Sequence, residues 1–171
     1  ALPLLVILGL PILAPTLVES ATGKSGSLAG HKCDLSSVIP VLNGPELTAT
    51  GPALIAAHTN VGPALLLRTP HQVLAAPYHR NTGGLRANTD IFGPDEALSR
   101  RVIAERGVDL LYVCGEPKPE QPPPTPEPAP ETSDPTHPTL YQRLQTGAAP
   151  EWLEPIPIPD AQPGEALYRV W

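Results

Sequence analysis

Three short apolar runs, separated by helix-like segments, constrain the fold of this 171-residue chain most strongly. The runs are "ALIAAHT" (53–59), "HQVLAAP" (71–77) and "VDLLYVC" (108–114). A continuous apolar run of this length between turn residues is typical of a strand that is buried on both faces. Because helical segments lie between the runs, the pattern predicts an α/β fold with a small, mostly parallel sheet and crossover helices.

The helical segments carry their own start and stop signals. Residues 34–43 predict a short helix with Asp34 as its N-cap. Pro63 stands at the first helical position of the segment 62–69. The clearest helix is "FGPDEALSRRVIAERG" (92–107), which Pro94 opens and Gly107 ends.

The chain ends in a second block of regular structure. "TLYQRLQTG" (139–147) predicts a short helix. "WLEPIPIP" (152–159) and "ALYRVW" (166–171) predict a hairpin that closes one edge of the sheet. The three prolines of the first strand confine it to the outermost position, because proline cannot donate a ladder hydrogen bond.

The segment 115–139 separates the two blocks and differs from both in composition. Ten of its 25 residues are proline and five are acidic. This composition predicts a solvated, polyproline-like insert within a domain that spans 33–171. Residues 19–32, which include "GKSGS", predict a flexible linker in front of that domain.

The first eighteen residues, "ALPLLVILGLPILAPTLV", carry no charge. Eighteen uncharged residues reach the lower limit for spanning a bilayer, so 1–18 predict the end of a transmembrane helix. A buried apolar arm of a soluble domain is the alternative. The flank 19–34 holds two acidic and two basic residues, so no positive excess retains it in the cytoplasm. We therefore expect the domain outside the cytoplasm.

The two cysteines, Cys33 and Cys114, lie at the edges of the first structural block. A disulfide between them would close a long loop around most of the core, which the chain-entropy model credits with about 4–5 kcal/mol. Such a bond implies an oxidising compartment. Two buried reduced thiols are the alternative, and we favour the disulfide.

Charge and motifs exclude several classes of function. With a net charge of −6, the chain has no basic patch for nucleic-acid phosphates, so we expect no nucleic-acid partner. The histidines show no metal-ligand spacing, which predicts no metal site. Nucleophile elbows, Walker loops and dinucleotide-binding glycine patterns are absent from the sequence, so no cofactor and no independent hydrolase are predicted.

One polar cluster, the tetrapeptide Tyr78, His79, Arg80 and Asn81, interrupts the apolar pattern directly after the second predicted strand. Ligands of open α/β sheets gather at the carboxyl ends of parallel strands. Arg80 offers a planar fork for phosphate or carboxylate, and His79 can exchange a proton near neutral pH. These four residues are therefore the candidate ligand-binding site. The alternative is structural: the cluster bonds to backbone carbonyls and holds the following turn.

Several blocks of the chain resemble a known family. "ALIAAHTNVGPALLLRTPHQVLAAPYHRN", "PDEALSRRVIAERGVDLLYVC", "LYQRLQTGAAPEWLEPIP" and "LYRVW" look like the C-terminal extracytoplasmic domain of mostly uncharacterised bacterial polytopic membrane proteins. Those proteins resemble GT-C type glycosyltransferases. The resemblance covers 28–171 apart from the proline-rich insert, and "APYHRN" is its most specific piece.

This resemblance implies a periplasmic domain on a bacterial inner-membrane protein. The parent would use a lipid-linked sugar donor, and this domain would help to bind an anionic or saccharide ligand. The catalytic acidic residues of such enzymes lie in earlier extracytoplasmic loops, so this chain is expected to lack them. The Trp-Trp-Asp motif of oligosaccharyltransferases is absent, which leaves that specific activity unsupported. The alternative is a non-catalytic structural or interaction domain of a membrane protein.

Overall fold

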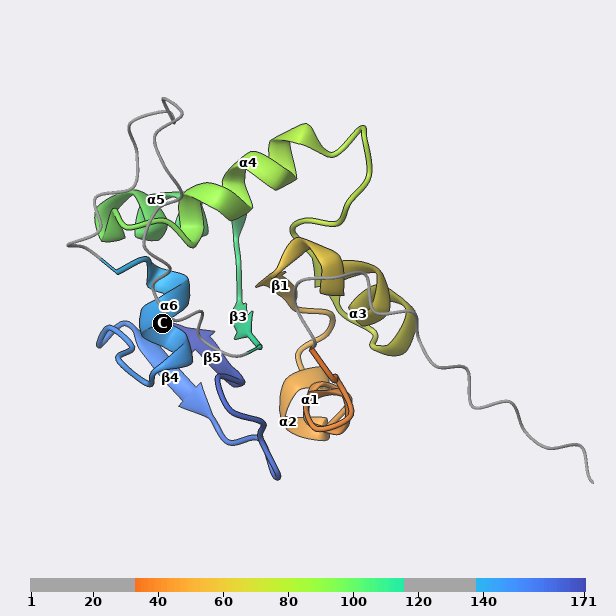
Figure 1. The fold of residues 1–171 in the computed structure, drawn as a ribbon. Helices are drawn as coiled ribbons and strands as arrows, with labels where there is room; N and C mark the ends of the chain where they lie inside the picture. The colour runs from red at the N-terminus through yellow and green to blue at the C-terminus, as the bar shows by residue number, and fades with distance from the viewer. Residues whose placement is uncertain (1–32, 116–137) are drawn as a thin grey trace, which may run out of the picture.

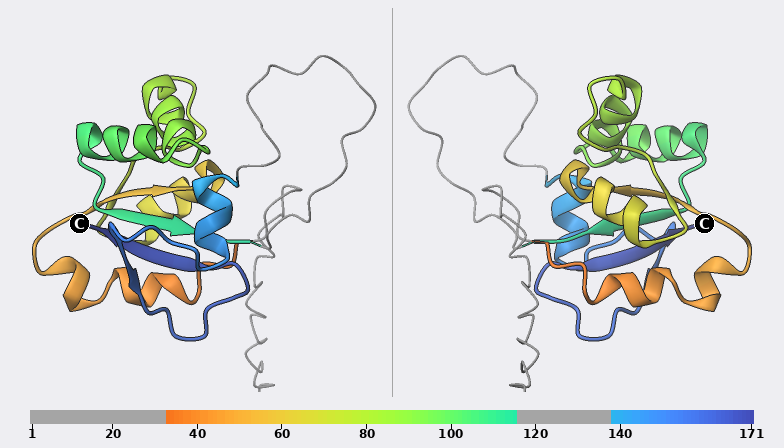
Figure 2. Two further views of the ribbon diagram at one scale, coloured as in Figure 1. Left: turned by 90° about the vertical axis from the view of Figure 1, so that its left-hand side faces the viewer. Right: turned by 90° about the vertical axis from the view of Figure 1, so that its right-hand side faces the viewer.

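The computed structural model describes residues 33–115 and 138–171, which form a five-stranded sheet with helices on both faces (Figures 1 and 2). The predictions for 1–18, for 19–32 and for the body of the proline-rich insert lie outside the described residues. Within the described ranges, no helix is both long enough and apolar enough to cross a membrane.

The sheet has the strand order β2-β1-β3-β5-β4. Its strands are β1 (Leu54–Ala57), β2 (Gln72–Val73), β3 (Leu110–Val113), β4 (Leu153–Ile156) and β5 (Ala166–Val170). β1 pairs in parallel with β2 and β3, whereas β5 is antiparallel to both β3 and β4. The α/β class is confirmed, but the sheet is mixed and not mostly parallel, because the C-terminal hairpin adds two antiparallel ladders.

The predicted closing hairpin is confirmed. β4 is the outermost strand, and Pro155 lies within it opposite Tyr168 of β5. The run 71–77 is shorter as a strand than predicted, since only Gln72 and Val73 form β2. Beyond this strand, the backbone turns toward the start of α3 (Gly62–Arg68), where a Cβ built on Gly62 would lie 2.4 Å from the Ala75 carbonyl oxygen.

The remaining helices follow the predicted order with local differences. They are α1 (Val38–Leu42), α2 (Pro45–Thr48), α4 (Thr82–Ile91), α5 (Glu96–Arg106) and α6 (Leu140–Gln145), with the short 3₁₀ helix η1 (Thr59–Val61) before α3. Asp34 was the wrong N-cap for α1, because Ser37 holds that position. α5 begins after Asp95, whose Oδ1 accepts from Leu98 N at 3.0 Å, and not at Pro94.

α4 is a helix that the sequence analysis does not predict. Its residues "TGGLRANTDI" include two glycines and several polar residues of low helix propensity. Its buried residues nevertheless lie at helical spacing: Gly84, Ala87, Asn88 and Ile91. A Cβ built on Gly84 would stand 2.3 Å from the Leu74 carbonyl oxygen, so the close approach of α4 to the end of β2 requires glycine there.

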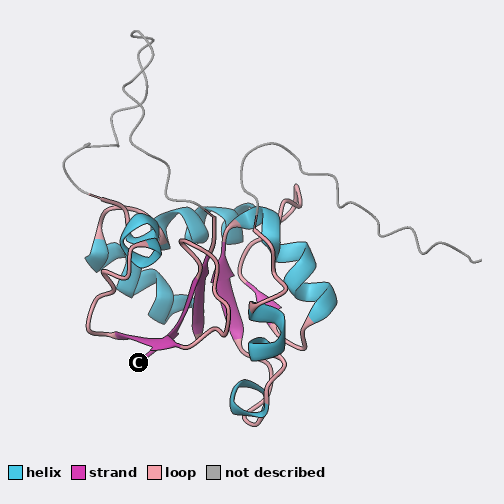
Figure 3. Ribbon diagram, turned by 60° about the horizontal axis from the view of Figure 1, so that its bottom comes forward, coloured by secondary structure: helices cyan, strands magenta, loops and turns pink. Residues whose placement is uncertain are grey.

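Two apolar cores cover the two faces of the sheet, and Figure 3 shows the strands enclosed between the helices. Alternate residues of β3 point to opposite faces: Leu111 and Val113 join one core, Leu110 and Tyr112 the other. α4, α5 and α6 contribute to the first core, and α1, α2 and α3 contribute to the second. β1 and β3 are therefore buried on both sides, as their continuous apolar runs predict, whereas β2 is an edge strand in which Gln72 is exposed and Val73 half-buried.

Candidate functional site

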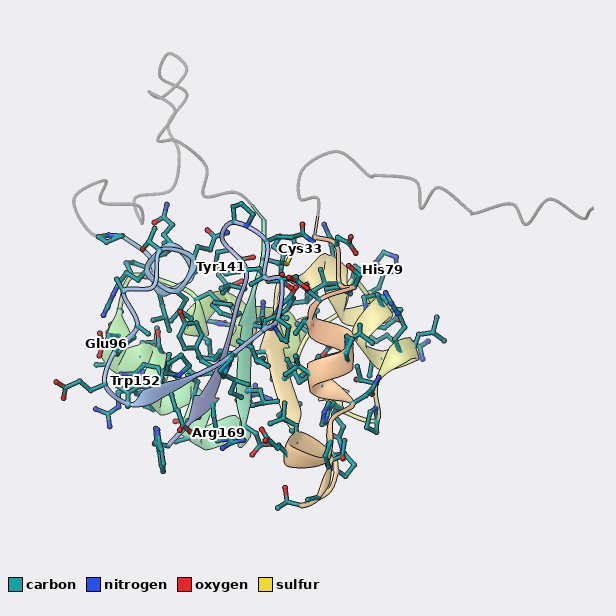
Figure 4. All side chains as sticks on the ribbon, turned by 90° about the horizontal axis from the view of Figure 1, so that it is seen from below. Cys33, His79, Glu96, Tyr141, Trp152 and Arg169 are labelled. Atoms are coloured by element: carbon teal, nitrogen blue, oxygen red, sulfur yellow. A yellow bond between two sulfur atoms is a disulfide. The ribbon has the colours of Figure 1, made fainter. Side chains whose placement is uncertain are left out.

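The candidate site lies at the edge of the sheet where the three parallel strands end. His58 follows β1, the loop 74–81 follows β2, and Cys114 follows β3. Figure 4 shows His79, Cys33 and Tyr141 along this one side of the molecule, with Trp152 and Arg169 on the opposite side. This is the edge at which loops of open α/β sheets form ligand sites.

The loop after β2 presents three polar side chains to solvent. Tyr78, His79 and Arg80 are exposed, and Tyr78 retains 54% of its accessible surface. A turn supports them: Tyr78 N donates to the Ala76 carbonyl at 2.7 Å, and Asn81 N donates to the Tyr78 carbonyl at 3.0 Å. Within the described ranges, these three exposed side chains form no hydrogen bond or ion pair with another residue.

Asn81 has a different environment from its three neighbours. It is the N-cap of α4, and its Oδ1 accepts a hydrogen bond from Gly84 N at 3.2 Å. Its Nδ2 donates to the Leu74 carbonyl at 3.3 Å. Both polar atoms of the side chain thus hold the strand-to-helix connection. Ligand binding by Tyr78, His79, Arg80 and Asn81 stays a prediction, and the first three have the accessible polar atoms that binding needs.

Tyr141 of α6 joins the ends of β1 and β3. Its hydroxyl donates to the Cys114 carbonyl at 2.9 Å and accepts from Cys114 N at 3.3 Å. The rings of Phe92 and His58 meet it edge-on, with centroids 5.2 and 6.4 Å away. Burial raises the pKa of the Tyr141 phenol, so it remains a neutral donor at this position.

The disulfide between Cys33 and Cys114 is present, which confirms the predicted pairing over two reduced thiols. It closes a loop with a sequence separation of 81 residues and places its two Cα atoms 5.5 Å apart. The bond holds Cys33 beside Cys114 at the end of β3, at the same edge of the sheet as the candidate loop.

A buried carboxylate, Glu165, lies close to this edge and was missed by the sequence analysis. Both of its oxygens accept from Ser37 Oγ at 2.7 Å, and they also accept from Tyr112 OH and Gln162 N at 2.9 Å. Burial, and then the adjacent carboxylate of Glu165, raises the pKa of Tyr112. Glu165 therefore connects the β4–β5 hairpin to α1 and β3. Both of its carboxylate oxygens already accept hydrogen bonds from within the protein.

Two further buried polar residues carry no sequence signal that pattern analysis could recognise. His71 accepts from Ala53 N through Nδ1 at 3.0 Å, and its Nε2 bonds to the Leu42 carbonyl at 2.7 Å. Asn88 is 7% exposed, and its Oδ1 has no hydrogen-bond partner among the described residues. His71 thus has a structural role, since both of its ring nitrogens bond to the backbone. The described ranges contain no cluster of three groups able to hold a metal ion.

Comparison with solved structures shows a similar fold in another protein. The C-terminal globular domain of an oligosaccharyltransferase from Archaeoglobus fulgidus superposes with a TM-score of 0.57 at 13% sequence identity. The match covers 78% of this chain and 94% of that domain. No family model matches this chain, and no curated protein matches it. At this identity the similarity establishes a shared fold.

Proposed function

We propose that this chain is the extracytoplasmic C-terminal domain of a polytopic membrane glycosyltransferase of the GT-C type, with a lipid-linked sugar donor. The observation that carries the proposal is the fold shared with the globular domain of an oligosaccharyltransferase over nearly all of that domain. The family resemblance of the sequence blocks points in the same direction. Both similarities concern the domain alone, so the reaction belongs to the proposed parent protein.

The disulfide supports an extracytoplasmic location. Disulfides persist in oxidising compartments and are rare in the cytosol, where thiols are kept reduced. The bond between Cys33 and Cys114 joins residues 81 apart and closes the core of the domain. In a bacterial cell, the proposed location is the periplasmic side of the inner membrane.

Within this proposal the loop after β2 is a ligand contact and not a catalytic centre. Arg80 would pair with the phosphate of a lipid-linked donor, His79 would add a second hydrogen bond, and Tyr78 would pack on the ligand. Their exposure at the carboxyl edge of the parallel strands supports this role. Catalytic carboxylates would come from other loops of the parent.

Membrane topology tests the location. Reporter enzymes fused directly after residue 171 and upstream of residue 1 in the parent gene product distinguish periplasm from cytoplasm. We expect a periplasmic C-terminus behind several membrane spans. A cytoplasmic C-terminus would contradict the proposal as a whole, including the lipid-linked donor.

A matched pair of arginine variants tests the ligand role. Arg80→Ala in the parent is expected to reduce sugar transfer from the lipid-linked donor by about 10-fold or more, because a charged hydrogen bond contributes roughly 1.5–3 kcal/mol. Its melting temperature should stay unchanged, since Arg80 makes no described side-chain contact. Arg101→Ala removes another exposed arginine, on α5, and should leave transfer unchanged.

A non-catalytic assembly domain is the second candidate function. The observation in its favour concerns Asn81. Both polar atoms of its side chain bond to the backbone of Leu74 and Gly84 and are not available to a ligand. This reading predicts that Arg80→Ala leaves transfer intact. A lowered melting temperature in that variant would also favour it, because the loop would then be structural.

A further inference from the structure

The side of the domain at β2 exposes three large apolar side chains. Leu66 and Leu67 of α3 keep 44% and 86% of their surface accessible, and Tyr78 of the following loop keeps 54%. Isolated exposed leucines are common, whereas neighbouring ones beside an exposed aromatic are typical of interaction surfaces.

The two segments that carry these side chains, α3 and the loop after β2, lie next to each other at the β2 edge of the sheet. The first turn of α3 packs on the loop after β2, where a Cβ on Gly62 would lie 3.2 Å from Ala76 Cβ. Leu66 follows Gly62 by one helical turn and so continues the same stripe of the helix. The right-hand panel of Figure 2 looks onto this side, with α3 in front of the sheet and the start of α4 above it.

The stretch of chain that contains α3 and the loop after β2 has a charge opposite to that of the whole chain. Residues 47–89 contain no aspartate or glutamate, and they carry three arginines, although the whole chain has a net charge of −6. Arg68 on α3, Arg80 in the loop and Arg86 on α4 are all exposed. The flanking carboxylates, Glu46 and Asp90, lie outside this stretch.

We propose that Leu66, Leu67, Arg68, Tyr78, Arg80 and Arg86 form a basic face that rests on the surface of an anionic lipid bilayer. Leucine and tyrosine side chains partition into the headgroup region, and arginines pair with lipid phosphates. The positive charge of these arginines complements the negative charge of an anionic bilayer. The inference rests on the proposed membrane attachment and identifies the surface that faces the membrane.

Site-specific fluorescence tests the proposal on the full 171-residue chain in lipid vesicles. The native cysteines are joined in a disulfide, so a new thiol at Leu67→Cys accepts an environment-sensitive probe selectively. Ala148→Cys supplies the matched control, because Ala148 is exposed in the turn that leads to β4, on the far side of the sheet. A lipid-borne quencher then reports which probe contacts the bilayer.

We expect the quenching of the probe to depend on its position in the chain and on the charge of the lipid and of the face. In vesicles with about a third of phosphatidylglycerol, quenching at position 67 should exceed that at position 148 by about twofold or more. It should fall to the control level in phosphatidylcholine vesicles, or when Arg68, Arg80 and Arg86 are all replaced by alanine. Circular dichroism checks that these surface variants stay folded.

Three results would overturn the proposal. Equal quenching at positions 67 and 148 would show that the basic face is not the membrane contact. Quenching at position 67 that is equally strong with anionic and neutral lipid would show that the contact is not electrostatic. Protection of the probe that rises with protein concentration in detergent, without vesicles, assigns the face to self-association. The topology fusions test membrane location separately, so docking can fail while the proposed function stands.

Discussion

Asn81 shows how one side chain can direct the chain from a strand into a helix. Its amide bonds backward to Leu74 at the end of β2 and forward to Gly84 in α4. The sequence places Asn81 in a cluster of polar residues that look equivalent. Only the structure separates this internal role from the outward-facing positions of Tyr78, His79 and Arg80.

Replacement of Asn81 by alanine should lower the free energy of unfolding by about 1–2 kcal/mol, because α4 loses its N-cap. Asn81→Asp is the matched variant: it keeps the Oδ1 acceptor for Gly84 N and replaces the Nδ2 donor to the Leu74 carbonyl with an oxygen, which cannot donate. Urea denaturation should therefore place Asn81→Asp between the native chain and Asn81→Ala. Equal stability of all three proteins would contradict the capping role.

Replacement of the buried His71 should lower the free energy of unfolding more than replacement of Asn81. His71→Phe keeps a ring in the core but leaves Ala53 N and the Leu42 carbonyl without their partner. Each unpaired buried group costs roughly 1–3 kcal/mol, so for the two groups together we expect a loss of about 2–6 kcal/mol in chemical denaturation. His79→Phe, at an exposed position, should stay within about 0.5 kcal/mol of the native chain.

Between elements, Glu96 joins α5 to β4 and α6. Its Oε1 accepts from Trp152 Nε1 at 2.9 Å, and its Oε2 accepts from Arg143 Nη1 at 2.7 Å. Arg100, one turn along α5, lies over the Trp152 ring at 5.8 Å. Hydrogen bonds from Trp152, and then from Arg143, lower the pKa of Glu96 below its ordinary 4.5.

This lowered pKa gives stability a defined pH dependence. The contribution of Glu96 is complete above pH 4.5 and is lost as the pH falls through the lower folded-state pKa. Because the side chain is 40% exposed, we expect at most about 1 kcal/mol after solvent screening. Urea unfolding at a series of pH values should show a smaller acid-induced loss for Glu96→Gln. Glu151→Gln, at an exposed carboxylate before β4, should retain the native pH profile.

For the whole molecule, the disulfide is the strongest single constraint on the unfolded chain. It joins residues 81 apart, for which the loop-entropy model gives about 4.5 kcal/mol. Reduction, or the double change Cys33→Ser and Cys114→Ser, should lower the unfolding free energy by a similar amount. Reductant should have no effect on the double variant. Alkylation and mass analysis without reductant should find no free thiol, and two labelled thiols would contradict the bond.

Local patterns predicted most elements, and the misses have physical causes. β1, β3, α3 and α6 formed where apolar runs and terminal signals agreed. The helix α4 was not predicted because two of the four residues on its buried face, Gly84 and Asn88, are not apolar and so do not contribute to an apolar periodicity. The glycine is needed for its close approach to Leu74, a contact that no local pattern contains.

The sequence alone determined that β1, β3 and β5 are strands, that prolines keep β4 at the edge, and that the polar loop follows a strand. These properties depend on side chains near one another in the chain, so periodicity and turn residues reveal them. The tertiary structure alone decided that β5 pairs with β3, that Asn81 is a cap, and that Glu165 joins Tyr112 and Ser37. The hydrogen bonds of Glu165 to Tyr112 and Ser37 span 53 and 128 residues, and they form only after the sheet has brought distant segments together.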